Sequence, residues 1–127
     1  MTFKENCPIY IQMADRLCDE ILAGTYAADE RVPGVREYSV LLQVNVNTTV
    51  KAYDLLSQRG IIYSRRGMGY FVAPEARNLI IEERKQNFRS HVLPYFIQQL
   101  FQLHIPLAEV QRAYDEAFQH DVKDENK

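Results

Sequence analysis

The sequence predicts a mainly α-helical fold with one small β-hairpin, followed by a short all-α arm. Apolar side chains recur at helical spacing over most of the chain, two short β-branched and aromatic runs flank a glycine-containing turn, and Pro74 separates this region from a further periodic stretch. The 127 residues suffice for one compact domain and an appendage. We therefore expect a first domain at residues 8–73, an arm at 74–120 and a disordered tail at 121–127.

The composition excludes several classes of protein. With 46% hydrophobic and 25% charged residues, the chain resembles ordinary folded proteins. No apolar run approaches the ~18 residues of a membrane span, and the N-terminus lacks the apolar core of a secretory signal, so we expect a cytoplasmic protein without a membrane partner. Cys7 and Cys18 have no CxxC partner and no histidine at ligand spacing. This predicts neither a disulfide nor a metal site, and we expect no cofactor.

The first predicted helix begins near Pro8, which suits a first helical turn, and ends before Gly24. Its apolar positions recur every four residues, at Met13, Leu17 and Ile21. This spacing gives the helix one apolar face that must pack against another element.

Two shorter helices follow. The first covers residues 35–42, and its expected inward side chains are Tyr38, Leu41 and Leu42. The second begins after Asn45, a strong N-cap, and ends at Gly60; its expected inward side chains are Thr49, Ala52, Tyr53 and Leu56. We expect the Thr49 hydroxyl to bond within its own helix, to the Asn45 carbonyl. The short turn between the two helices favours a helix-turn-helix.

Residues 61–65 and 70–72 predict a β-hairpin whose loop contains Gly67 and Gly69, because glycine supplies the positive φ that such loops need. The hairpin is the last part of the most basic region of the chain. Residues 31–72 carry six Lys or Arg and two Asp or Glu, in a protein of net charge −2. Such side chains pair with phosphate oxygens, and nearby Asn and Thr side chains also reach base edges. The basic residues are Arg31, Arg36, Lys51, Arg59, Arg65 and Arg66.

The arm begins with a helical stretch at 75–103 that Pro94 interrupts. A proline inside a helix removes one backbone hydrogen bond, so we expect either a kink near 90–94 or two abutting helices. His104 and Ile105 then form a turn, and Pro106 opens a last helix.

This arm is too short to enclose a core of its own, although it carries many large apolar side chains. They must meet a partner surface, which we expect to be the same arm of a second copy in a two-fold homodimer. The alternative is that the arm folds back on the first domain. The expected dimerisation residues are Phe88, Val92, Tyr95, Phe96, Leu100, Leu103, Leu107, Val110 and Tyr114.

Several blocks of the sequence occur in an order typical of one family. They are PIYIQMADRLCDEILAGTY, RVPGVREYSVLL and VNVNTTVKAYDLLSQRGIIYSRRGMGYFV, which together span residues 8–72. In these blocks the chain resembles GntR-type bacterial transcription regulators, specifically their short YtrA-like branch. The resemblance implies a winged helix-turn-helix domain followed by a dimerisation arm, with the third helix in the DNA major groove and the hairpin, or wing, near the minor groove. It also suggests control of a transporter operon.

The resemblance assigns Arg36 to a phosphate. It places Asn45, Asn47, Thr48 and Lys51 at the start of the recognition helix, and it places Arg65, Arg66, Gly67 and Gly69 in the wing. From the residues themselves, Val46 and Val50 share one helix face opposite the inward set, so we expect them to contact thymine methyls in an A·T-rich half-site. Two assignments keep an alternative. Lys51 binds either a phosphate or a guanine edge, and the wing arginines bind either phosphates or a narrow minor groove.

The sequence thus predicts a homodimeric, sequence-specific DNA-binding repressor that occupies an inverted-repeat operator in double-stranded DNA. The alternative is a winged-helix interaction module that binds an acidic protein partner. We expect no enzyme, because no nucleophile motif surrounds His91, His104 or His120. The arm is too small for a dedicated ligand-binding chamber. A pocket at the dimer seam between Phe88, Tyr95 and Phe96 is the alternative place where a small-molecule effector could bind.

Overall fold

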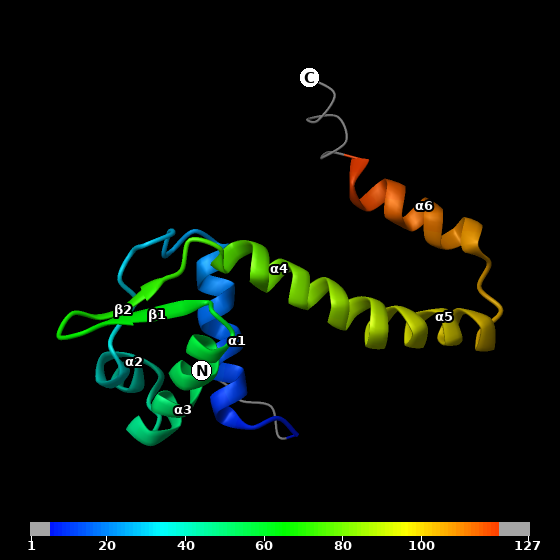
Figure 1. The fold of residues 1–127 in the computed structure, drawn as a ribbon. Coiled ribbons are helices and arrows are strands. Elements are labelled where there is room, and N and C mark those ends of the chain that lie inside the picture. Colours follow the sequence, from blue (N-terminus) through cyan, green and yellow to red (C-terminus); the bar gives the residue numbers. More distant parts are fainter. Residues whose placement is uncertain (1–5, 120–127) are drawn as a thin grey trace. The chain divides into compact units, whose positions relative to one another are not determined.

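The computed structural model describes residues 6–119, which form helices and one two-stranded antiparallel hairpin (Figure 1). This confirms the mainly α-helical fold class. The tail expected at 121–127 lies outside the described residues. The chain divides into two compact units, the first ending at Arg84 and the second beginning at Lys85.

Three helices build the core of the first unit: α1 (Ile9–Leu22), α2 (Val35–Leu42) and α3 (Val46–Gln58). The apolar face of α1 is buried as its four-residue spacing predicts, and α3 packs against it. All four expected inward residues of α3 are buried: Thr49, Ala52, Tyr53 and Leu56.

The buried face of α2 differs from the expectation at one position. Leu41 was expected inward and is 62% exposed, whereas Ser39 is buried beside Tyr38 and Leu42. A serine is tolerated there because its hydroxyl lies 2.7 Å from the Val35 carbonyl oxygen and 2.7 Å from the Thr49 hydroxyl.

The expected bond from Thr49 to the Asn45 carbonyl is therefore wrong. The Thr49 hydroxyl bonds across the helix interface to Ser39 instead, at 2.7 Å, and it lies 4.0 Å from the Met13 sulfur. The carbonyl of Asn45 accepts backbone amides of the first turn of α3. A buried hydroxyl pair thus joins the two helices of the helix-turn-helix.

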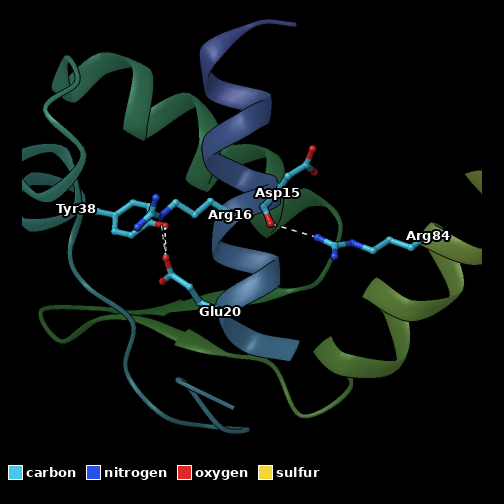
Figure 2. Close-up of polar contacts among 5 residues, drawn as sticks. All are labelled: Asp15, Arg16, Glu20, Tyr38 and Arg84. Carbon is cyan, nitrogen blue, oxygen red and sulfur yellow. Dashed lines mark hydrogen bonds and ion pairs between the residues drawn. The ribbon is translucent and has the colours of Figure 1, made fainter. Parts of the chain in front are cut away.

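Tyr38 links α2 to α1. Its hydroxyl donates to Oε1 of Glu20 at 3.1 Å, and the same carboxylate oxygen accepts from Nε of Arg16 at 3.1 Å (Figure 2). The carboxylate therefore satisfies the polar end of an otherwise buried ring.

The hairpin consists of β1 (Ile62–Arg65) and β2 (Gly69–Val72), with Ile62 opposite Val72 and Arg65 opposite Gly69. Gly67 and Gly69 have φ of +75° and +100°, which confirms why glycine is needed in this loop.

A third segment, 30–32, runs along β2. The amide of Val32 donates to the Tyr70 carbonyl at 3.0 Å, and the amide of Val72 donates to the Glu30 carbonyl at 2.9 Å. These bonds tie the hairpin to the helical core.

The next helix, α4 (Ala76–Asn87), contributes to the first unit. Ala76 and Ile80 are buried in its core, so the unit continues past the limit expected at residue 73. Arg84 of α4 points to α1, where its guanidinium donates to the Asp15 carbonyl at 3.2 Å (Figure 2) and pairs with the Asp19 carboxylate at 2.6 Å.

The arm continues through a π-helical segment, η1 (Phe88–Val92), into α5 (Leu93–Gln102). Pro94 has no amide hydrogen for an α-helical bond to the carbonyl of residue 90, and the backbone before it widens to the π pattern. The chain stays helical through 88–92, so the helical stretch is not divided into two separate helices at the proline.

His104 forms the expected turn after α5, with φ of +56°, and the amide of Ile105 donates to the Leu100 carbonyl at 2.9 Å. The last helix, α6 (Leu107–Ala117), begins after Pro106. The apolar side chains of the arm lie largely open in the single chain: Phe88, Val92, Tyr95, Phe96, Leu103, Leu107 and Tyr114 are exposed, and Leu100 and Val110 are half-buried. Within 6–119, no helix is long and apolar enough to cross a membrane.

Candidate nucleic-acid interface

The start of α3 presents small polar and apolar side chains to solvent. Asn45 caps the helix by accepting the backbone amide of Asn47 at its side-chain oxygen, at 2.8 Å. Val46 and Val50 are 41% and 40% exposed, so neither is buried against α2, while Thr48 is half-buried. Opposite its buried face, α3 therefore offers hydrogen-bonding groups and methyl groups side by side.

The N-terminus of α2 carries a positive side chain, Arg36. Arg36 is exposed in the first turn of α2 and forms no ion pair with another described residue. The N-cap of α2 is Gly34, which has no side chain to bond the first amides of the helix. Free amides and the helix dipole attract anions there, and Arg36 adds a full charge.

Lys51 is held by a residue that the sequence analysis missed. Its Nζ lies 4.9 Å from the ring centroid of Tyr10, which is half-buried in the first turn of α1. The two residues are far apart in sequence and meet only because α1 packs on α3, so no local pattern could have paired them.

Arg65 lies across the aromatic face of the hairpin rather than at its tip. Its guanidinium carbon is 5.6 Å from the Tyr63 centroid and 5.1 Å from that of Phe71, and the two rings stack at 5.7 Å. The Tyr63 hydroxyl donates to Asp29 at 2.8 Å, and this bond raises the pKa of Tyr63. Tyr63 and Asp29 thus support a wing arginine, a role the sequence analysis did not assign.

Arg31 contacts the wing loop through its guanidinium group. Its Nε donates to the Met68 carbonyl at 3.1 Å, and a Cβ at Gly69 would stand 3.1 Å from that nitrogen. The guanidinium therefore packs closely against the Gly69 backbone, and a side chain at this position would require it to shift. In the loop itself Arg66 is exposed and pairs with no acidic group of the described chain.

The basic set is smaller than the sequence count suggested. Nη1 of Arg59 pairs with the Glu83 carboxylate of α4 at 3.2 Å, and Arg31 is committed to the loop. The side chains still available to a ligand are Arg36, Lys51, Arg65 and Arg66. An exposed acidic residue, Asp54, also lies on α3 one turn after Val50, and the sequence analysis did not consider it.

No group of three or more His, Cys, Asp or Glu side chains within 6–119 could hold a metal ion. Both cysteines are free thiols, and burial raises the pKa of Cys18 to about 11, so this thiol stays protonated at neutral pH.

Comparison with known proteins points to one family. The family described as bacterial regulatory proteins, gntR family, matches residues 9–72. An uncharacterized HTH-type transcriptional regulator of Bacillus subtilis, YhcF, is 32% identical over 108 residues, which cover 85% of this chain and 88% of that protein. The HTH-type transcriptional repressor YtrA of the same species is 32% identical over 79 residues, covering 62% of this chain and 61% of that protein.

Solved structures similar to this chain include members of the same family. A putative GntR-family transcriptional regulator from Bacteroides thetaiotaomicron is 42% identical with a TM-score of 0.76, over 89% of this chain and 98% of that one. The DNA-binding domain of AraR, solved in complex with an operator, is 28% identical with a TM-score of 0.53, over 57% of this chain and 93% of that one.

Proposed function

The chain belongs to the GntR family of bacterial regulatory proteins and is a DNA-binding transcription regulator, and from this premise we propose that it acts as a homodimeric repressor of an operon. Its proposed ligand is an inverted-repeat operator in double-stranded DNA. In this proposal α3 reads bases in the major groove, Arg36 binds a phosphate, and Lys51 binds a phosphate or a guanine edge. The wing carries Arg65 and Arg66 to the neighbouring backbone or minor groove.

The exposed face of α3 carries the proposal. It presents an amide at Asn47, methyl groups at Val46 and Val50 and a cation at Lys51, all opposite a fully buried face. Amides and methyl groups are the side-chain groups that distinguish base pairs in the major groove. The AraR domain, which shares this fold, is bound to an operator in its solved complex.

The arm supports the dimer. It exposes Phe88, Tyr95 and Phe96 in the single chain, together with the other apolar residues of α5 and α6. Aromatic surface of this kind is typical of subunit interfaces. Two copies related by a two-fold axis place their recognition helices in successive major grooves, about 34 Å apart, so the operator should be an inverted repeat.

Repression is the proposed direction of control. YtrA, which is 32% identical over the matched region, is named a repressor. A protein that occupies an operator needs no additional activity to repress, because it competes with the transcription machinery for the same DNA. A small-molecule effector bound at the dimer seam fits this proposal, since Phe88, Tyr95 and Phe96 would line it.

Footprinting on the DNA upstream of the protein's own gene tests this function. We expect a protected inverted repeat, and we expect the double variant Arg36→Ala/Arg66→Ala to lose binding while remaining dimeric, because two phosphate contacts are removed from each subunit. Arg112→Ala, which removes one positive charge from each subunit, is the control, since Arg112 is exposed on α6 and is not one of the proposed DNA-binding residues. Wild-type protein that binds no duplex at low salt, but captures an acidic protein, would favour the interaction-module alternative.

A further inference from the structure

The exposed side of α3 has two flanks. Successive residues of an α-helix are about 100° apart, so Val50 and Lys51 lie on either side of Asn47 when the helix is viewed along its axis. Val46 shares the flank of Val50, because residues four apart lie on one face. The methyl groups and the cation of this helix therefore point in different directions.

A fixed aromatic ring lies on the lysine flank. Tyr10 is half-buried and packs against the core from the first turn of α1, and the Lys51 Nζ sits 4.9 Å from its ring centroid. The negative face of the ring attracts the ammonium, and no acidic side chain within the described residues forms an ion pair with Lys51. The ring thus holds the ammonium toward α1 and away from Val50.

An ammonium held in this way keeps its capacity to bind an anion. It has three hydrogen-bond donors, and a ring occupies only one side of it. A phosphate oxygen at the edge of the groove is within reach of this arrangement, whereas a guanine edge at the centre of the groove would require the side chain to leave the ring.

We propose that Tyr10 is a positioning residue for DNA recognition: its ring holds the Lys51 ammonium on the α1 side of α3 for a backbone phosphate and leaves the bases to Val46, Asn47 and Val50. This inference rests on the proposed function. It settles the choice between phosphate and guanine that the sequence alone left open for Lys51.

The test uses the full chain and the duplex that the wild type selects from a random-sequence pool. Tyr10→Leu removes the π face but keeps an apolar side chain, Tyr10→Met is a second such variant, and Tyr10→Phe keeps the ring. Each is combined with Lys51→Ala in a double-mutant cycle. Fluorescence anisotropy measures Kd from about 50 to 200 mM salt, and thermal unfolding shows that each variant is folded.

We expect Tyr10→Leu and Tyr10→Met to weaken binding by about 2- to 5-fold, and Tyr10→Phe to retain the wild-type affinity. In the Lys51→Ala background, the substitutions at Tyr10 should have no further effect, because the ring then has no cation to hold. Lys51→Ala should lower the slope of log Kd against log salt by about 0.9 for each subunit, or about 1.8 for the bound dimer, and leave the selected base sequence unchanged.

Two results would overturn the inference. If Lys51→Ala changes the selected base at one position of the site and leaves the salt slope intact, Lys51 reads a base. If Tyr10→Leu weakens binding equally with and without Lys51, Tyr10 has only a structural role. A wild-type chain that selects no sequence from the pool would instead contradict the proposed function itself.

Discussion

Tyr38 and Tyr53 are buried residues whose hydroxyls are bonded inside the first unit. Tyr38 donates to Glu20 at 3.1 Å, and Tyr53 donates to the Pro33 carbonyl at 2.5 Å. Burial raises the pKa of both phenols, and for Tyr38 the negative charge of Glu20 raises it further. Both therefore stay neutral in the folded protein at a pH where an exposed tyrosine ionises.

This difference predicts a loss of stability in alkali. An acid whose pKa is raised by folding stabilises the folded state below its unfolded pKa, about 10 for tyrosine, and this stability is lost as pH rises toward the folded pKa. The free energy of unfolding should fall above about pH 10, by up to ~1.4 kcal/mol per pH unit for each tyrosine. Urea unfolding between about pH 8 and 11 should show a shallower fall for Tyr38→Phe than for the wild type. Equal slopes for Tyr38→Phe and the wild type would refute this explanation.

At the scale of the elements, two kinds of contact fasten α4 to the first unit. Ile80 is only 2% exposed, whereas the ion pair of Arg84 with Asp19 joins side chains that are 43% and 64% exposed. Truncating a buried isoleucine costs ~2–5 kcal/mol, but an exposed ion pair contributes only ~0–1 kcal/mol. Burial of the apolar face should therefore decide whether α4 stays in place.

Two alanine substitutions on α4 measure this difference. Ile80→Ala should lower the free energy of unfolding by ~2–5 kcal/mol, because it leaves a cavity beside the core. Arg84→Ala should lower it by less than ~1 kcal/mol, and the small loss should shrink further in high salt. Urea unfolding of both variants gives the comparison, with Arg112→Ala as the surface control. Equal losses for Ile80→Ala and Arg84→Ala would instead show that the polar contacts of Arg84 attach α4 as strongly as the burial of Ile80 does.

The elements of the fold could largely be predicted from the sequence, because each depends on residues close together in the chain. The four-residue spacing in α1, the N-cap at Asn45 and the glycines of the hairpin loop all act locally. Leu41 shows the limit of such reasoning. An apolar residue on α2 was expected inward, but Ser39 is buried there instead. Its hydroxyl lies 2.7 Å from the Val35 carbonyl oxygen of its own helix and 2.7 Å from the Thr49 hydroxyl of another helix, and the second contact is not visible in a local pattern.

The candidate site shows the same limit more strongly. Sequence spacing indicated which residues of α3 face outward, because helical periodicity is regular. It could not show that Tyr10 holds Lys51 or that Arg59 is paired with Glu83, because these contacts join distant segments. Charge counted along a chain therefore overestimates the charge that a surface offers to a ligand.

At the scale of the whole molecule, the first unit and the arm differ in how they bury apolar surface. The first unit has a core that includes α1, α2, α3 and part of α4, whereas no residue of α5 or α6 is buried in the single chain. In the proposed dimer, a second copy would cover the apolar side chains that the arm exposes.

A charge placed in the arm's apolar surface should separate the two proposed subunits. Phe96→Asp puts an unpaired carboxylate among apolar side chains of the interface, so we expect a monomer in analytical ultracentrifugation at micromolar concentration. The first unit should keep its own unfolding transition, because its core does not include this residue. Operator affinity should fall by about 100-fold or more. In the dimer, binding of one subunit holds the other near the second half-site, and a monomer lacks this increase in local concentration. Arg112→Ala, on the polar face of α6, should remain a dimer with wild-type affinity. A Phe96→Asp protein that still sediments as a dimer would place the interface elsewhere on the chain.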